Sequence, residues 1–338
     1  AMFDLARRTW SAAIVDLCGI GMHMLPEVVA SGTTLGRVTA STSVETGLST
    51  ATLVVVGGGD TQLGLVGLGV AAPGSVTIIG GTFWQQTLVV DTPLIDPERR
   101  LRTLCHTAPD RWMVEGIGFY SGLALRWFRD AFCEQETAVA RAAGHDPYLA
   151  LERLAEATPP GANGLLGLFS NMMDAKRWVH AAPSFIGFDI TDPRRSGKGA
   201  FVRAILEAAA YISRTHITIL SDLSGQRCSD AVFTGGAARN RLWAQMLADV
   251  LNVRIHVPSI KESTALGAAL YAGVGGGLFG NIAEAAERPI DWEATYEPDP
   301  AAHAVYDAHY SRWMAAYARS LELCAARLTT PLWQAAGA

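Results

Sequence analysis

The stretch that decides the fold is residues 53–83, LVVVGGGDTQLGLVGLGVAAPGSVTIIGGTF. Its first four residues are apolar, three of them valines, and they run into three glycines, which is typical of a buried strand that ends in a tight turn. Asp60 stands at the tip of this turn, before a glycine-spaced apolar stretch that predicts a short, closely packed helix. A second strand, 76–79, leads to two glycines and Thr82. The sequence therefore predicts an acid and a hydroxyl beside two turns whose backbone can approach phosphates.

Two simpler interpretations of these residues stay open at this point. An Asp between a strand and a helix is often only a helix N-cap, so Asp60 alone does not indicate catalysis. Neither common phosphate-loop motif is present, because Gln62 stands where G-x-G-x-x-G needs its last glycine and no G-x-x-x-x-G-K-[ST] occurs. The rest of the chain must decide between these interpretations.

Composition excludes several classes of protein. With 338 residues, 49% hydrophobic and 17% charged, the chain is typical of a folded globular protein of one large or two ordinary domains. A net charge of −5 argues against nucleic acid or an anionic membrane as the main partner. The five cysteines are scattered without metal-ligand spacing, which predicts reduced thiols and no structural metal. The first residues lack the apolar core of a signal peptide, and the uncharged run 263–283 contains six glycines, so we expect a cytoplasmic protein without a membrane span.

Strand and helix patterns alternate along the remaining chain, which predicts an α/β fold. We expect helices at 5–17, 118–132, 134–143, 147–156, 199–223, 240–251, 264–272 and 300–327, and strands at 35–38, 86–91, 102–107, 230–234 and 254–258. The helix 199–223 should cross behind the sheet. Gly122 interrupts the helix pattern of 118–132, where either close helix packing or the approach of a ligand would require a bare backbone.

Four motifs in order along the chain give a resemblance to a known family. TGGAARNRLWAQMLADVL at 234–251 and KESTALGAALYAG at 261–273 closely resemble the adenosine-binding end of the FGGY carbohydrate kinases. GGGD at 57–60 resembles their catalytic-aspartate motif, and GGT at 80–82 their second phosphate motif. The resemblance implies an actin-like, ribonuclease H-like fold with ATP between two domains. It places the end of the N-terminal, substrate domain at 1–72 and the whole C-terminal, nucleotide-binding domain at 73–338.

The same resemblance implies roles for individual residues. Asp60 would be the base that takes the proton of the acceptor hydroxyl. The nucleotide would be held by Thr82 at the γ-phosphate, by Gly122, and by Gly235, Gly236 and Asn240 towards the adenosine. ATP and Mg²⁺ are the implied cofactors. Thr61 and Arg126 stand where glycerol kinases have nucleotide- or substrate-contacting glutamines, so those two roles are not transferred.

The substrate class and the activity of the chain alone are further expectations. GGTFWQQ, FYSGLALRWFRDAFC, HAAPSF and LTTPLWQA most resemble the autoinducer-2 kinases within the family, which implies phosphorylation of a primary hydroxyl on a small sugar, polyol or the autoinducer-2 precursor, with xylulokinase-like sugar kinases as neighbours. The family's initial D-x-G-T/S phosphate hairpin does not occur before residue 1, so we expect the chain alone to bind nucleotide but to be impaired in phosphorylation. The strand 53–56 would then lie along an open edge, which predicts self-association into a homo-oligomer. The alternatives are a catalytically inactive nucleotide-binding or interaction remnant of a sugar kinase, and an actin-like ATPase without an acceptor.

Overall fold

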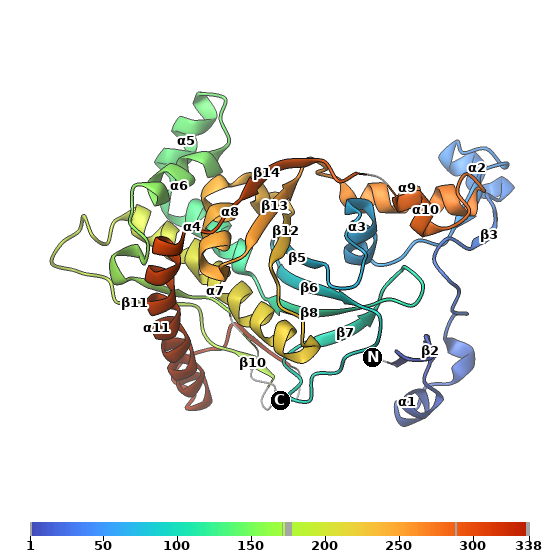
Figure 1. Cartoon of the computed structure of the whole chain (residues 1–338), viewed down its shortest axis with the longest axis horizontal. Coiled ribbons are helices and arrows are strands. Elements are labelled where there is room, and N and C mark those ends of the chain that lie inside the picture. Colours follow the sequence, from blue (N-terminus) through green and yellow to red (C-terminus); the bar gives the residue numbers. More distant parts are fainter. Residues whose placement is uncertain (1, 171, 173–177, 288, 336–338) are drawn as a thin grey trace.

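The computed structural model describes residues 2–170, 172, 178–287 and 289–335, and their centre is one mixed sheet. Seven strands lie in the order β14-β13-β12-β5-β6-β8-β7 (Figure 1). They are β5 (Val76–Gly80), β6 (Trp84–Val90), β7 (Arg102–Cys105), β8 (Trp112–Gly118), β12 (Asp230–Thr234), β13 (Arg254–Pro258) and β14 (Trp292–Tyr296). Strands β5, β12 and β13 run parallel, and the other neighbours pair antiparallel. The α/β class is confirmed.

Helices with apolar faces cover one side of this sheet. They are α4 (Ser121–Phe132), α5 (Glu134–Ala142), α6 (Pro147–Glu156), α7 (Lys198–Ser224), α8 (Arg241–Leu251) and α11 (Pro300–Ala325). The indole of Trp84, from the sheet, is fully buried, stacks on Trp243 at 4.5 Å between ring centroids, and donates to Ser213 Oγ of α7 at 2.8 Å. The long helix predicted at 199–223 therefore crosses behind the sheet, as expected.

The other side of the sheet carries α3 (Asp60–Leu68), which lies between the sheet and α9 (Ser263–Gly275) (Figure 1). The α3 side chains Leu65 and Leu68 pack with Val89, Met113 and Val232 of the sheet. Helices α3 and α9 touch backbone to backbone, because a Cβ at Gly67 would lie 1.9 Å from Ser263 O and one at Gly267 would lie 1.9 Å from Leu63 O. The glycine-spaced helix predicted after Asp60 is confirmed, and the glycines explain its close packing.

The first 56 residues differ from the prediction at two points, the start of the first helix and the strand at 53–55, which is only partly buried with Val54 exposed although a buried strand was predicted. They form β1 (Phe3–Asp4), β2 (Thr9–Trp10), α1 (Ala12–Leu17), a short 3₁₀ turn (Met22–Met24), β3 (Thr34–Arg37), α2 (Ala40–Thr46) and β4 (Leu53–Val55). The helix predicted at 5–17 is wrong before Ala12, because Phe3 and Trp10 pair as rings 5.5 Å apart across a hairpin and Ser11 caps the helix that follows. Local ring packing and a capping serine therefore outweigh the helical spacing of apolar residues.

Several strands were not predicted. Besides β1, β2, β8 and β14, they are β9 (Leu166–Leu168) with β11 (Ser184–Ile186), and β10 (Val179–His180) with β15 (Trp333–Gln334). Strand β8 contains Glu115 and two glycines, residues that are depleted in strands, and it lies between β6 and β7, which correspond to the strands predicted at 86–91 and 102–107. The remaining helix is α10 (Ile282–Ala286). Within the described ranges, no helix is both long and apolar enough to cross a bilayer.

Candidate functional site

Two glycine-rich turns meet at the carboxyl ends of the parallel strands β5 and β12. Thr234 pairs with Ile79 in the parallel register, so both strands end at the same level. Gly235 has φ 89°, and a Cβ at this position would lie 2.5 Å from Gly80 O. Only glycine fits there, because both the backbone conformation and the space exclude a side chain. The turns after β5 and β12 are thus held side by side.

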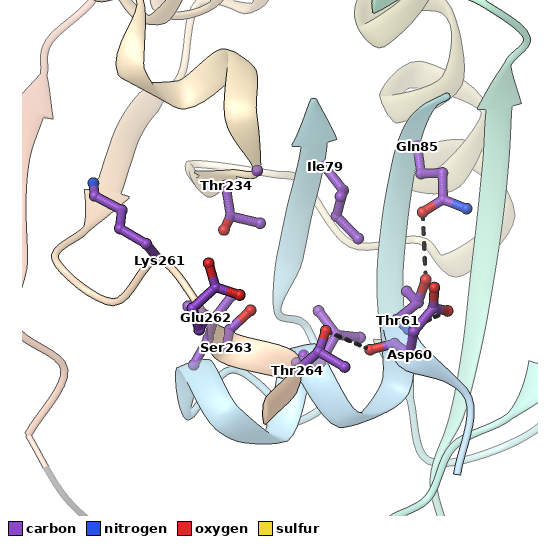
Figure 2. A pocket seen from close by; sticks show the side chains of 13 residues that line it. Asp60, Thr61, Ile79, Gln85, Thr234, Lys261, Glu262, Ser263 and Thr264 are labelled. Carbon is purple, nitrogen blue, oxygen red and sulfur yellow. Dashed lines mark hydrogen bonds between the residues drawn. The ribbon is translucent and has the colours of Figure 1, made fainter. Parts of the chain in front are cut away.

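Asp60 lies at the start of α3 and faces a cavity of about 220 Å³. The cavity is lined by Asp60, Thr61, Gly64, Leu65, Leu68, Ile79, Gln85, Thr234, Gly235, Lys261, Glu262, Ser263 and Thr264 (Figure 2). The N-cap of α3 is Gly59, not Asp60, although the Asp60 carboxylate accepts a hydrogen bond of 2.7 Å from Thr61 N. The simple capping interpretation therefore does not account for an exposed carboxylate at the cavity wall.

Neighbouring side chains hold the Asp60 region in place without neutralising its charge. Thr61 Oγ1 donates to Gln85 Oε1 of β6 at 3.4 Å, and Thr264 Oγ1 of α9 donates to the main-chain oxygen of Asp60 at 3.1 Å. Lys261 points away from Asp60 in Figure 2 and pairs with Glu293 instead. Three elements thus fix the position of Asp60 while leaving its carboxylate available.

A second cavity of about 200 Å³ continues from the first. Its lining is Thr234, Gly235, Gly236, Ala238, Arg239, Pro258, Ile260, Lys261 and Glu262, of which four residues also line the Asp60 cavity. Gly236 opens a 3₁₀ turn (Gly236–Arg239), and a Cβ there would have no heavy atom within 4 Å. Open space at Gly236, next to the crowded Gly235, makes this turn a surface that a ligand can approach closely.

The other predicted residues have structural roles beside these cavities. Asn240 caps α8, with its Oδ1 accepting from Trp243 N at 2.8 Å, and it is not among the residues that line either cavity. Gly122 allows α4 to approach the turn before Thr82, because a Cβ there would lie 1.7 Å from Gly81 O. The exposed Thr82 also lies outside the two linings. The structure thus brings Asp60, Gly235 and Gly236 together around two adjoining cavities, and the catalytic or nucleotide roles of all six residues stay predictions.

The sequence did not single out several residues of the cavity wall. Gln85, Thr234, Glu262, Ser263 and Thr264 were quoted only within longer motifs. For residues 261–264 the sequence signal was their position, because they follow a strand and lead into a helix, where side chains meet at the carboxyl edge of a parallel sheet.

A buried carboxyl also lies in the sheet beneath α3. Glu115 of β8 is 1% exposed, pairs with Arg102 of β7, and has no hydrogen-bond partner for Oε2 within the described part of the chain. Burial raises the pKa of Glu115, and the Arg102 guanidinium opposes that rise. Nothing in the sequence marked Glu115 as part of this region, except that a glutamate is unusual in an otherwise apolar strand.

Comparisons with known proteins agree with this geometry. The profile of the FGGY family of carbohydrate kinases, C-terminal domain, matches residues 77–276, and that of the N-terminal domain matches residues 1–67. The chain is 43% identical over 336 residues to the autoinducer-2 kinases of Escherichia coli K12 and of Yersinia enterocolitica, covering 99% of this chain and 63% of each relative. It therefore spans less than two thirds of the length of these relatives.

Solved structures give the same result. The xylulose kinase of Rhodospirillum rubrum superposes with a TM-score of 0.75 at 29% identity, over 94% of this chain and 62% of that one. The glycerol kinase of Plasmodium falciparum with ADP, at 18% identity and a TM-score of 0.75 over 94% of this chain and 61% of its own, supports the fold alone. The fold is that of the actin-like ATPases, as predicted. The chain belongs to the FGGY family of carbohydrate kinases.

Proposed function

We propose that this chain is the nucleotide-binding part of an ATP-dependent carbohydrate kinase that phosphorylates a primary hydroxyl of a small sugar, a polyol or the autoinducer-2 precursor. The observation that carries the proposal is the position of Asp60. It lines a cavity that adjoins a second cavity at the Gly235–Gly236 turn. Identity to autoinducer-2 kinases at 43% favours the autoinducer-2 precursor among these substrates. We also propose the boundary at 72/73 and a cytoplasmic location.

Residues on one side of the cavity act on the acceptor hydroxyl, and residues on the other side hold the nucleotide. Asp60 accepts the proton of the acceptor hydroxyl while that oxygen attacks the γ-phosphorus of ATP, and the bond to the bridging oxygen breaks to release ADP. Backbone N–H groups of the glycine turns at Gly235 and Gly236, with Thr82 and Gly122 nearby and Asn240 at the adenosine side, hold the nucleotide. The products are the sugar phosphate, ADP and one proton.

The residues present fit a magnesium ion. Mg²⁺ in kinases needs few protein ligands, because phosphate oxygens and waters complete its octahedral shell. Glu262 offers a carboxylate for the ion on the wall of the same cavity as Asp60, and a closed cage of three or more His, Cys, Asp or Glu does not occur among the described residues. When bound, Mg²⁺ would neutralise phosphate charge and orient the leaving group.

Acceptor-dependent release of ADP tests the proposal. A form of the enzyme that contains this chain should release ADP when given ATP, Mg²⁺ and the autoinducer-2 precursor, and more slowly with xylulose. Release without any acceptor would favour an actin-like ATPase. Binding of ADP without release under any of these conditions would favour the second candidate, a catalytically inactive nucleotide-binding or interaction remnant.

A further inference from the structure

Three residues that lie side by side across the sheet form one wall of the Asp60 cavity. Gln85 of β6 pairs with Ile79 of β5, and Ile79 pairs with Thr234 of β12. All three line the cavity (Figure 2). Because neighbouring strands lie about 4.8 Å apart, Gln85 and Thr234 are separated by about 10 Å along this wall. The wall therefore has two polar ends with an apolar residue between them.

The two ends of this row have different neighbours. Thr234 is followed by Gly235, and both residues also line the second cavity, at the Gly236 turn. Gln85 does not line that second cavity, and its side chain is hydrogen-bonded to Thr61 instead. Thr61 is the residue next to Asp60. The Gln85 side chain therefore belongs to the Asp60 end of the cavity, where the proposed function puts the acceptor.

The side-chain amide of Gln85 is only half used. Thr61 Oγ1 donates to Gln85 Oε1 at 3.4 Å, and Gln85 Nε2 has no hydrogen-bond partner among the described residues. In Figure 2 this nitrogen points away from Thr61, on the side where the Asp60 carboxylate lies. Gln86, the next residue of the strand, is fully buried, and both ends of its amide are bonded, to Ser213 and His216. Gln86 is therefore a structural residue, whereas Gln85 keeps two N–H donors for a ligand.

The other side-chain donors on the cavity wall are either used or lie away from Asp60. The Thr61 hydroxyl donates to Gln85, and the Thr264 hydroxyl donates to the main-chain oxygen of Asp60 at 3.1 Å. The remaining donors lie on the side of the cavity away from Gln85 (Figure 2): Thr234, Lys261 and Ser263. Within the described ranges, the Gln85 amide is thus the unused side-chain donor that a molecule meets beside the Asp60 carboxylate.

We propose that Gln85 selects the acceptor by donating a hydrogen bond from Nε2 to the oxygen on the carbon next to the reacting primary hydroxyl. The inference rests on the proposed function, because it requires the acceptor to lie at Asp60. The reacting hydroxyl donates to the Asp60 carboxylate, and a second contact is needed to fix the direction in which that oxygen attacks. An oxygen one carbon away accepts from the amide as a hydroxyl or as a carbonyl. The favoured substrates are therefore primary alcohols with a hydroxyl or carbonyl on the neighbouring carbon.

Thr61 is the positioning residue for this contact. Its hydroxyl binds Gln85 Oε1 and so decides which end of the amide is presented to the acceptor. Rotation about the last side-chain torsion of a glutamine is otherwise nearly free, and it would exchange the donor for an acceptor. An analogue that lacks the neighbouring oxygen leaves the oriented donor unpaired, which is how such a site rejects it.

Paired acceptors test the inference. A form of the enzyme that contains this chain and turns over is given the autoinducer-2 precursor or an analogue in which hydrogen replaces the oxygen next to the reacting hydroxyl. Xylulose and its matching deoxy analogue are the second pair. Gln85→Met keeps the length of the side chain but has no donor. It should reduce the kcat/KM preference for the complete acceptor about tenfold, the effect of one hydrogen bond.

Three further variants separate recognition from structure. Thr61→Val should lose the same preference with Gln85 intact, whereas Thr61→Ser, which keeps the hydroxyl, should retain it. Gln135→Met, at an exposed glutamine of α5, is the matched control and should leave the preference unchanged. ADP affinity, measured by calorimetry, should be the same in all of these proteins, and circular dichroism checks that each is folded.

The possible failures are distinguishable. An unchanged preference in folded Gln85→Met would overturn the inference, as would an equal loss of kcat/KM for both members of a pair. Weaker ADP binding by Gln85→Met would assign the amide to the nucleotide instead. If Gln85→Met does not fold, the contrast between Thr61→Val and Thr61→Ser decides. Absence of acceptor-dependent ADP release from the unaltered enzyme would contradict the proposed function itself, and the inference would fall with it.

Discussion

Asp60 can serve as a base only if its carboxylate stays free of a cationic partner. The lysine on the same cavity wall, Lys261, is paired with Glu293, and the Asp60 carboxylate accepts only the Thr61 N–H among the contacts described. A carboxylate in this state keeps its lone pairs for an incoming hydroxyl proton.

Asp60→Asn should therefore lower turnover by roughly 10²- to 10⁴-fold, the usual effect of losing a general base. Asparagine keeps the size of the side chain but cannot take a proton at neutral pH. The measurement is acceptor-dependent ADP release by a form of the enzyme that turns over, with ADP affinity measured in parallel and expected to stay unchanged. Asp91→Asn, an exposed change elsewhere, is the control, and equal activity of both variants would return Asp60 to a structural role.

A substitution at Gly236 tests nucleotide binding at the neighbouring turn without disturbing the fold. A side chain at Gly236 meets open space, so Gly236→Leu should fold normally and fill the cavity beside Gly235. We expect at least a tenfold loss of ADP affinity by calorimetry, about 1.4 kcal/mol. Gly197→Leu, where the nearest atom to the new Cβ is 3.4 Å away at the start of α7, should bind ADP normally. Normal affinity in the Gly236 variant would exclude nucleotide at this turn.

At the scale of elements, the crossing of α3 and α9 connects Asp60 to the 261–264 side of the cavity. Gly67→Val would push a side chain into Ser263 O, so the helices must separate, and we expect a loss of about 1–3 kcal/mol in the free energy of unfolding. Chemical denaturation measures this loss. Gly64→Ala is the control on the same helix, because the nearest atoms to its Cβ would be side-chain oxygens at 3.3 and 3.4 Å and the nearest backbone atom would lie 4.0 Å away. Equal stability of both variants would contradict the close crossing.

The regularity of each helix and strand pattern also decided whether that element could be predicted from the sequence. Long periodic segments were clear, and the helix predicted at 147–156 and the strands at 230–234 and 254–258 have the observed bounds. Strand β8 was missed because Glu115 and its glycines hide the alternation, and the hairpin before Ala12 was missed because ring pairing is not periodic. For the site, glycine turns and residues that follow a strand, such as Asp60 and Glu262, indicate where side chains meet. Gln85 lies within a strand and reaches the cavity through tertiary packing, which spacing does not encode.

At the scale of the whole molecule, buried titratable groups make stability depend on pH. Burial lowers the pKa of His106 and His180 to about 4 and of His216 to about 3, and it raises the pKa of Glu207 to about 7. Unfolded histidines bind protons below about pH 6.5. The histidine contribution to stability is thus lost as pH falls from 6.5 towards 4, whereas the Glu207 contribution is present at low pH and lost as pH rises through 7.

Three histidines outweigh one glutamate, so the chain should be less stable at pH 5 than at pH 7. His216, whose Nδ1 donates to Gln86 Oε1 at 2.5 Å, should account for up to about 1.4 kcal/mol per pH unit of this loss. Urea unfolding at the two pH values measures the difference, and His216→Gln should reduce the pH dependence even if it lowers stability overall. A chain that is equally or more stable at pH 5 would show that these histidines are not held neutral.

The claim on which the whole account depends is that the cavity between Asp60 and the Gly235–Gly236 turn holds a nucleotide. Calorimetric titration of ADP, with Mg²⁺ present, into the purified 338-residue chain tests it most directly, because the chain contains both glycine turns and needs no acceptor. The account predicts saturable binding of a single ADP per chain, whether or not the chain alone phosphorylates a sugar. A chain that is folded by circular dichroism and gives no binding heat at millimolar ADP would contradict it.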